Sequence, residues 1–201
     1  QLISIAEETS KQNVKPPTQP SKIFSLVESL ISYEHTEYGS NDFQRQPLLK
    51  TMLSPVGPVM AAADVNGDKL IDIFVGGVKE NPGKLYLQGA SGTFTPSVTF
   101  NFKEDFACTD GDALFFDADM DGDMDLYVAS GGYHDYLRND KALQDRLYLN
   151  NGLGRFTKTI GALPPMLNSK SCVRAADIDS DGDLDLFVGG RVMPGEYPNP
   201  Q

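Results

Sequence analysis

The chain of 201 residues contains no tryptophan, only two cysteines and few basic residues, with 17 Lys and Arg against 28 Asp and Glu. Its net charge of −11 and the lack of a basic run exclude a nucleic-acid ligand, because phosphate binding needs a positive patch. No apolar stretch reaches the roughly 20 residues that cross a bilayer, so no membrane span is expected. With 40% hydrophobic residues, 19 glycines and 13 prolines, the chain is expected to fold as short strands joined by tight turns.

The aspartates concentrate in three segments of identical length, residues 64–72, 117–125 and 177–185, which we call acidic loops 1, 2 and 3. Together they hold more aspartates than the entire net charge. A single run of acids is often only a solvated segment, but three copies with the same internal spacing argue for a shared role.

Each acidic loop offers oxygen ligands at its first, third, fifth and ninth residues, and a main-chain carbonyl at its seventh. Calcium takes about 6 to 8 oxygens, whereas magnesium prefers a stricter octahedron and zinc prefers nitrogen or sulfur. Without a cation, so many neighbouring carboxylates would repel one another. We therefore predict up to three Ca²⁺ ions. The predicted ligands are Asp64, Asn66, Asp68, Leu70 and Asp72; Asp117, Asp119, Asp121, Asp123 and Asp125; and Asp177, Asp179, Asp181, Asp183 and Asp185.

Acidic loop 1 is predicted to be the weakest site. It has Asn66 at the third position, and Lys69 at the sixth position where the other loops have Gly122 and Gly182. A sharp turn at the sixth position is easiest for glycine, and Lys69 adds a positive charge.

The acidic loops are predicted to join β-strands and not the helices of an EF-hand. The twelfth position is Val75, Val128 or Val188, where an EF-hand has a bidentate Glu. Apolar, β-rich runs follow each loop at 73–77, 126–130 and 186–190, and small apolar residues precede it at 59–63, 113–116 and 173–176. Each loop is thus expected to connect a hairpin.

A second hairpin confirms a repeat. Residues 84–88 run on to Phe94, and residues 146–150 run on to Phe156, with Leu-Tyr-Leu at the start of both. Four short strands per repeat of roughly 40 to 60 residues indicate an all-β fold of β-propeller blades. The expected blades are 58–100, 112–160 and 172–201, the last incomplete, within a propeller segment spanning 21–201. Residues 1–20 are expected to be a linker or disordered lead.

Three features leave alternatives open. The second repeat has an insertion within 131–144 that contains Tyr133, His134, Tyr136 and Arg138, and that could contact a protein or glycan or be a tolerated surface loop. Cys108 and Cys172 could form a disulfide or remain buried thiols. Residues 23–33 could form an amphipathic helix or a strand.

The acidic loops and the Phe-Val-Gly-Gly runs that follow loops 1 and 3 resemble FG-GAP and VCBS repeats, the calcium-bearing blades that also build the integrin α-subunit propeller. The segments 46–49, 54–58, 146–149 and 172–177 resemble more closely secreted bacterial VCBS-repeat proteins of the ASPIC/UnbV and cartilage acidic protein group. This resemblance implies a propeller usually of seven blades, of which this chain supplies about two and a half to three. It also implies an extracellular or cell-surface location, on the bacterial outer surface, and favours strand over helix for 23–33.

The leading functional hypothesis is a non-enzymatic propeller segment, with structural calcium and no catalytic residues, that binds a protein or glycan at the cell surface. The remaining blades of a larger chain are its expected partners. One alternative is the scaffold of a secreted polysaccharide lyase or hydrolase, whose acids would come from Glu104, Asp105, Asp110 and Asp112. Another is an integrin-like adhesion module. No nucleotide-binding or protease motif is present in the sequence.

Overall fold

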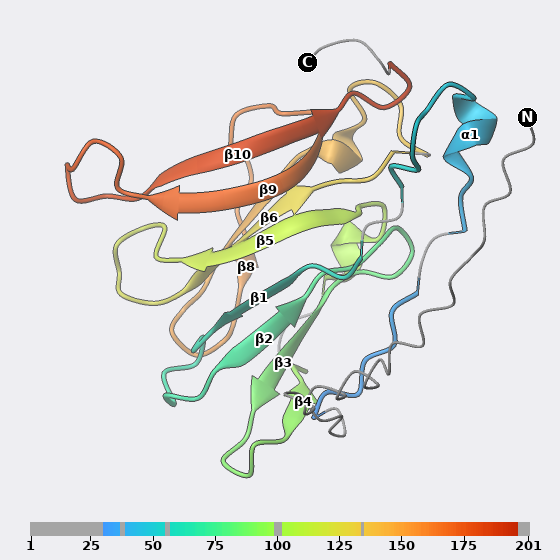
Figure 1. Ribbon diagram of the computed structural model, residues 1–201. Helices are drawn as coiled ribbons and strands as arrows, with labels where there is room; N and C mark the ends of the chain where they lie inside the picture. The colour runs from blue at the N-terminus through green and yellow to red at the C-terminus, as the bar shows by residue number, and fades with distance from the viewer. Residues whose placement is uncertain (1–29, 37–38, 55–56, 99–101, 134, 197–201) are drawn as a thin grey trace, which may run out of the picture.

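The computed structural model describes residues 30–36, 39–54, 57–98, 102–133 and 135–196 (Figure 1). These residues form two four-stranded antiparallel sheets and one two-stranded sheet. One short helix, α1 (Asp42–Arg45), and two 3₁₀ turns, Lys103–Asp105 and Lys141–Leu143, complete the regular structure of the described residues. The expectation of a nearly all-β chain is confirmed.

In each sheet the strands follow one another in chain order. The first sheet contains β1 (Met60–Ala63), β2 (Asp72–Val75), β3 (Lys84–Gln88) and β4 (Phe94–Pro96). The second contains β5 (Asp110–Phe116), β6 (Asp125–Ser130), β7 (Arg146–Leu149) and β8 (Thr157–Lys158). The third contains β9 (Ser169–Ala176) and β10 (Asp185–Val192). This chain-order arrangement of four antiparallel strands is consistent with propeller blades.

The three acidic loops occupy equivalent places. Each joins the first and second strands of its sheet, and its ninth residue pairs with the last residue of the first strand: Ala63 with Asp72, Phe116 with Asp125, and Ala176 with Asp185. All three loops extend from the same end of the sheets, and α1 lies at the opposite end (Figure 1). The predicted hairpins are therefore confirmed, and they gather the acidic residues at one end.

The first strands of the three sheets lie next to one another, with β5 between β1 and β9 (Figure 1). The approach of β5 and β9 is close, because a Cβ placed on Gly111 would lie 2.4 Å from the main-chain oxygen of Lys170. Only glycine tolerates so short a distance to a backbone atom.

Two apolar cores separate the three sheets. The first core lies between sheets one and two and includes Phe74 and Leu126, whereas the second lies between sheets two and three and includes Tyr127 and Val173. Successive side chains of a strand point to opposite faces, so Leu126 and Tyr127 enter different cores. This is why every residue of β6 is buried.

Residues 41–54, which we call the clasp, cross the end of the sheets opposite the acidic loops. The Arg45 guanidinium donates to the main-chain oxygens of Tyr133 and Tyr136, at 2.7 Å in both cases. The Gln46 side chain donates to the Gly195 oxygen at 3.1 Å. The clasp thus joins the insertion of the second repeat to the segment that follows β10.

The clasp changes the interpretation of the 131–144 insertion. Tyr133 and Tyr136 are 1% and 4% exposed, so these two rings do not face solvent, whereas Arg138 of the same insertion is exposed. The Tyr136 hydroxyl bonds with Thr109 Oγ1 at 2.8 Å, and Tyr133 packs with Leu49 in a small core. Residue 134 lies outside the described residues.

The remaining alternatives concern the two cysteines and the N-terminal segments. Cys108 and Cys172 are free thiols. The predicted linker at 1–20 and most of the segment at 23–33 lie outside the described residues. No helix among the described residues is long and apolar enough to cross a membrane.

Candidate metal centre

A repeated set of hydrogen bonds curls the three acidic loops. In each loop the carboxylate of the first residue accepts a bond from the backbone N–H of the sixth, and the fifth residue accepts one from the seventh. The first set joins Lys69 to Asp64 at 2.8 Å, Gly122 to Asp117 at 3.0 Å and Gly182 to Asp177 at 3.2 Å. The second joins Leu70 to Asp68 at 2.8 Å, Asp123 to Asp121 at 3.1 Å and Asp183 to Asp181 at 3.1 Å.

The backbone takes a positive φ at both the fourth and the sixth positions of every loop. At the sixth position Lys69 has φ 67°, where Gly122 and Gly182 have 93° and 98°. At the fourth position the glycine is instead in loop 1, as Gly67, and loops 2 and 3 place Met120 and Ser180 there. Each loop therefore carries one glycine and one strained residue, at a cost of about 1 to 2 kcal/mol. Turn strain at Lys69 does not by itself make loop 1 the weakest.

The ninth aspartate ties each loop to its sheet. Asp72 and Asp125 are 0% exposed. One oxygen of each accepts from the N–H of the second loop residue, and the other accepts from the residue that ends or follows the third strand. These donors are Val65 at 3.1 Å and Gln88 at 2.8 Å for Asp72, and Ala118 and Asn150, both at 2.8 Å, for Asp125. Buried carboxylates held by two backbone N–H groups position the loop as well as being candidate ligands.

The third loop keeps only half of this arrangement. Asp185 accepts from the Ile178 N–H at 3.0 Å, but no residue of the described part of the third sheet corresponds to Gln88 or Asn150. One oxygen of Asp185 is consequently left to join the carboxylates of Asp177 and Asp179.

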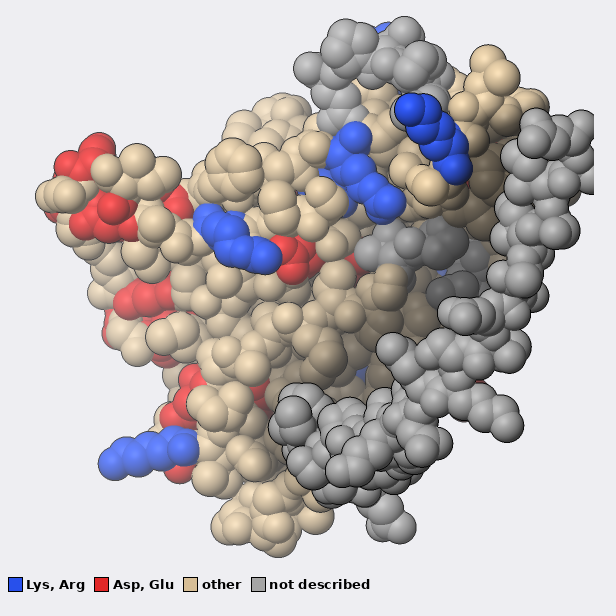
Figure 2. Space-filling model, viewed as in Figure 1, with Lys and Arg blue, Asp and Glu red and all other residues tan. Residues whose placement is uncertain are grey.

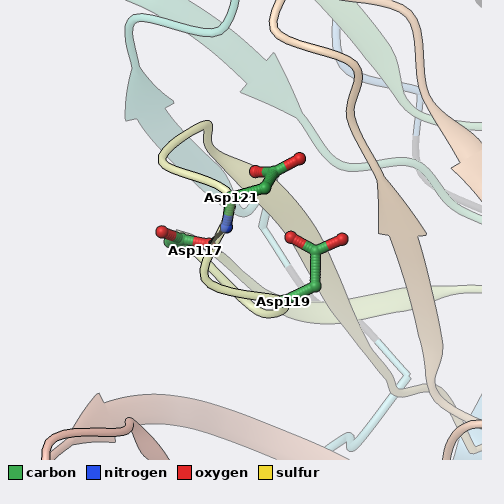
Figure 3. A group of neighbouring side chains, drawn as sticks. All are labelled: Asp117, Asp119 and Asp121. Carbon is green, nitrogen blue, oxygen red and sulfur yellow. Dashed lines mark hydrogen bonds between the residues drawn. The ribbon is translucent and has the colours of Figure 1, made fainter.

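Two groups of three carboxylates occur within the described residues, and each has oxygens within 4.8 Å of one another. They are Asp117, Asp119 and Asp121 in loop 2 (Figure 3), and Asp177, Asp179 and Asp185 in loop 3. The donors are all oxygen, which suits a hard cation such as calcium and not zinc. The structure thus brings six of the predicted ligands into two groups, and leaves those of loop 1 outside any such group.

Electrostatics separate loop 1 from the other two. Burial, with the neighbouring charges of Asp121 and Asp125, raises the pKa of Asp123 to about 6, and the Oδ1 atom of Asp123 is buried without a hydrogen-bond partner. The charge of Asp181 raises the pKa of Asp183. Although desolvation opposes it, hydrogen bonds from backbone N–H groups lower the pKa of Asp64. Burial also raises the pKa of Asp72 in loop 1, so what sets loop 1 apart is its seventh residue, Leu70, where loops 2 and 3 have Asp123 and Asp183.

The surface of the molecule reflects this distribution. Figure 2 shows acidic side chains gathered at the end from which the acidic loops project. A cation in each loop would reduce the repulsion among the carboxylates, since Coulomb energy scales with charge and inversely with distance. The donor set of loops 2 and 3 fits Ca²⁺.

The acidic residues considered for catalysis lie outside the acidic loops, and two of them form a buried ion network. Asp105 and Asp110 are buried, and Arg146, which is 5% exposed, pairs with Asp110 at 2.5 Å and with Asp105 at 3.5 Å. Lys158 pairs with Asp105 at 2.5 Å. This ion network joins β5 and β7 to the segment before β5. The sequence did not lead us to predict this ion network. A charged residue at the start of an apolar strand, Arg146 in β7, is the pattern that could have indicated it.

The other two acids of that set are more exposed. Asp112 is a partly buried residue of β5 that pairs with Arg174 at 2.7 Å, and Glu104 is exposed in the 3₁₀ turn. Asp105 and Asp110 thus differ from the other two acids, because both are buried in ion pairs.

Comparison with protein families gives one match. The family model described as FG-GAP-like repeat matches residues 64–128 and 131–188, which is more than half of the chain. The first match begins with acidic loop 1 and ends in β6, and the second begins in the insertion and ends in β10. A comparison with curated proteins gave no match.

Proposed function

Because the chain belongs to the FG-GAP-like repeat family, we propose that it is a calcium-binding segment of a β-propeller. The observation that carries this proposal is the repeated acidic loop, with the same backbone hydrogen bonds in all three copies and three carboxylates brought together in two of them. Calcium would be bound by up to three loops, most weakly by residues 64–72.

The role proposed for calcium is structural. In each loop the aspartates lie between two paired strands, so an ion held there would fix the hairpin and offset the charge of the loop. Its ligands would come from the grouped carboxylates, Asp117, Asp119 and Asp121 in loop 2 and Asp177, Asp179 and Asp185 in loop 3. This follows from the position of the loops and requires no contact between the ion and an external partner.

We propose that further blades complete the propeller and pack against β10. Phe187 of β10 is 62% exposed, whereas the equivalent Phe74 and Tyr127 are 0% and 1% exposed and lie in the two cores between neighbouring sheets. Because segments 46–49, 54–58, 146–149 and 172–177 resemble the ASPIC/UnbV and cartilage acidic protein group, we propose that the chain is part of such a larger protein.

The proposed activity is binding of a protein or glycan outside the cell, without catalysis. Short, exposed calcium loops suit the extracellular medium, where calcium sites of about 10⁻⁴ to 10⁻³ M affinity are filled. Asp105 and Asp110 are the two buried acids of the set considered for catalysis. They form ion pairs with Arg146 and Lys158, which supports a structural role for them. A polysaccharide panel assayed for reducing ends or unsaturated products tests the enzymatic alternative.

The calcium proposal is tested by thermal unfolding with 5 mM Ca²⁺, taken as about five times a 10⁻³ M dissociation constant, or with excess chelator. We expect chelation to lower the melting temperature by several degrees, because ligands that bind only the folded state stabilise it by mass action. The paired change Asp119→Asn and Asp179→Asn should remove most of this difference. Glu104→Gln, which removes an exposed charge outside the loops, should preserve it. Identical melts with calcium and chelator would refute the proposal.

A further inference from the structure

Asn150 lies between two acidic loops and bonds to both. It follows β7 and is 8% exposed. Its backbone N–H donates to Asp125 Oδ1 of loop 2 at 2.8 Å. Its side-chain Nδ2 donates to the main-chain oxygen of Val65 in loop 1 at 2.8 Å and to that of Met124 in loop 2 at 3.1 Å. One residue of the second sheet therefore connects the first and second loops.

The rest of the 150–154 turn is also in contact with both loops. The Gly154 N–H donates to the Val65 oxygen at 2.9 Å. A Cβ on Gly67 would lie 3.8 Å from the Gly152 oxygen, and a Cβ on Gly152 would lie 3.2 Å from Asp123 Oδ2. The turn is thus packed between loop 1 on one side and loop 2 on the other.

Val65 transmits the position of loop 1 to this turn. It is 1% exposed and lies between Asp64 and Asn66, two of the predicted ligands. An ion that fixes the side chains on either side also fixes the carbonyl of Val65. That carbonyl accepts hydrogen bonds from Asn150 and Gly154, so both donors are held when loop 1 is ordered.

We propose that Asn150 couples the two sites, so that Ca²⁺ in acidic loop 1 raises the affinity of acidic loop 2 for Ca²⁺, and the reverse. The inference rests on the proposed function, because it requires both loops to bind calcium. By thermodynamic linkage the coupling is reciprocal. The factor by which Ca²⁺ in loop 1 raises the calcium affinity of loop 2 equals the factor by which Ca²⁺ in loop 2 raises that of loop 1. Asn150 acts as a positioning residue and touches neither ion.

The first sheet supplies a matched control. Gln88 occupies the place of Asn150, and its N–H donates to Asp72 Oδ1 at 2.8 Å. However, Gln88 Oε1 accepts from the Ile71 N–H of its own loop at 3.0 Å. Shortening Gln88 to alanine therefore alters one loop alone. Shortening Asn150 to alanine keeps its backbone bond to Asp125 and removes its side-chain bonds to Val65 of loop 1 and to Met124 of loop 2.

The test is a calcium titration by calorimetry in protein whose loop 3 is disabled by Asp177→Asn and Asp179→Asn. The affinity of loop 2 is measured with loop 1 intact and with loop 1 disabled by Asp64→Asn. We expect disabling loop 1 to weaken loop 2 about fivefold, the equivalent of one ordinary hydrogen bond. In Asn150→Ala the factor should fall to about one, and in Gln88→Ala it should stay near five.

The outcomes distinguish the inference from the proposed function. The coupling is refuted, and the calcium function stands, if both loops bind calcium but disabling loop 1 leaves the affinity of loop 2 unchanged in protein that keeps Asn150. It is also refuted if disabling loop 1 still weakens loop 2 about fivefold in Asn150→Ala. If neither loop binds calcium, the coupling is refuted, and the calcium function is refuted as well when the parent protein with loop 3 intact also binds none.

A second measurement does not depend on the folding of Asn150→Ala. In protein that keeps Asn150 but has loop 2 disabled by Asp117→Asn and Asp119→Asn, calcium in loop 1 should slow hydrogen exchange of the Gly154 amide by about fivefold. Exchange at Gly154 that does not respond to calcium contradicts the coupling.

Discussion

Replacing Arg146 by methionine should destabilise the protein by about 3 to 5 kcal/mol, the range measured when one partner of a buried ion pair is removed. Arg146 is 5% exposed, and its partners Asp105 and Asp110 are 3% and 5% exposed. Without the guanidinium, Asp105 keeps Lys158, whereas Asp110 keeps only hydrogen bonds from neutral groups, including the Gly77 N–H at 2.6 Å. A buried carboxylate without a cation is the main cost.

A second substitution shows how much of this loss of stability comes from the unpaired charge of Asp110. Asp110→Asn in the Arg146→Met background removes the uncompensated charge while keeping an acceptor for the Gly77 N–H. We expect the double variant to be more stable than Arg146→Met alone, because a neutral amide costs less to bury than a carboxylate.

The assay is urea unfolding at pH 7 in saturating calcium, followed by circular dichroism and tyrosine fluorescence, since the chain has no tryptophan. Arg155→Met is the control: Arg155 is exposed in the same repeat, and its loss should change the free energy of unfolding by no more than about 0.5 kcal/mol. A loss below about 1 kcal/mol for Arg146→Met, or a double variant no more stable than the single one, would show that the network contributes little.

Two further predictions concern other parts of the chain. In chelator, the pKa of Asp123 in the folded protein is raised from 3.8 to about 6. The stabilisation that results is fully present below pH 4 and is lost as the pH rises through 6. Its loss lowers the free energy of unfolding by at most about 3 kcal/mol, before solvent screening is taken into account. Asp123→Asn should remove that decline in melts between pH 4 and 7; an unchanged decline counts against it. Asp42→Ala should cost about 2 kcal/mol in urea unfolding, because the buried carboxylate accepts from Leu53 N, Ser54 N and Ser54 Oγ. A cost near zero would show that the clasp does not stabilise the fold.

Much of the fold follows from local patterns in the sequence. The period of the acidic loops, the apolar runs beside them and the Leu-Tyr-Leu hairpins predict all ten strands of the three sheets near their observed places. The strands of the third sheet are longer than expected, 169–176 and 185–192 against 173–176 and 186–190. Their outer residues extend beyond the apolar run, which is the only part that a local pattern detects.

The candidate site is predictable in its residue types and less so in the part that each residue plays. The ninth aspartates were predicted only as ligands, yet Asp72 and Asp125 bind backbone N–H groups of a third strand distant in sequence. Loop 1 has its glycine at the fourth position, whereas loops 2 and 3 have theirs at the sixth. The sequence does not show that these glycines are equivalent, because the positive φ at both positions is seen only in the structure. Tyr133 packs with Leu49 of the clasp, more than 80 residues away, and Tyr136 bonds to Thr109, and no local pattern reports such contacts.

The clasp also sets an order of events during synthesis. Arg45 bonds to carbonyls 88 and 91 residues further along the chain, and Gln46 bonds to one 149 residues further along. At about 5 to 20 residues per second, a ribosome needs roughly 7 to 30 s to make the last of these partners after it has made Gln46. During that interval the three sheets can form from local contacts while residues 41–54 wait. The first described helix of the chain is consequently among the last elements to reach its native place.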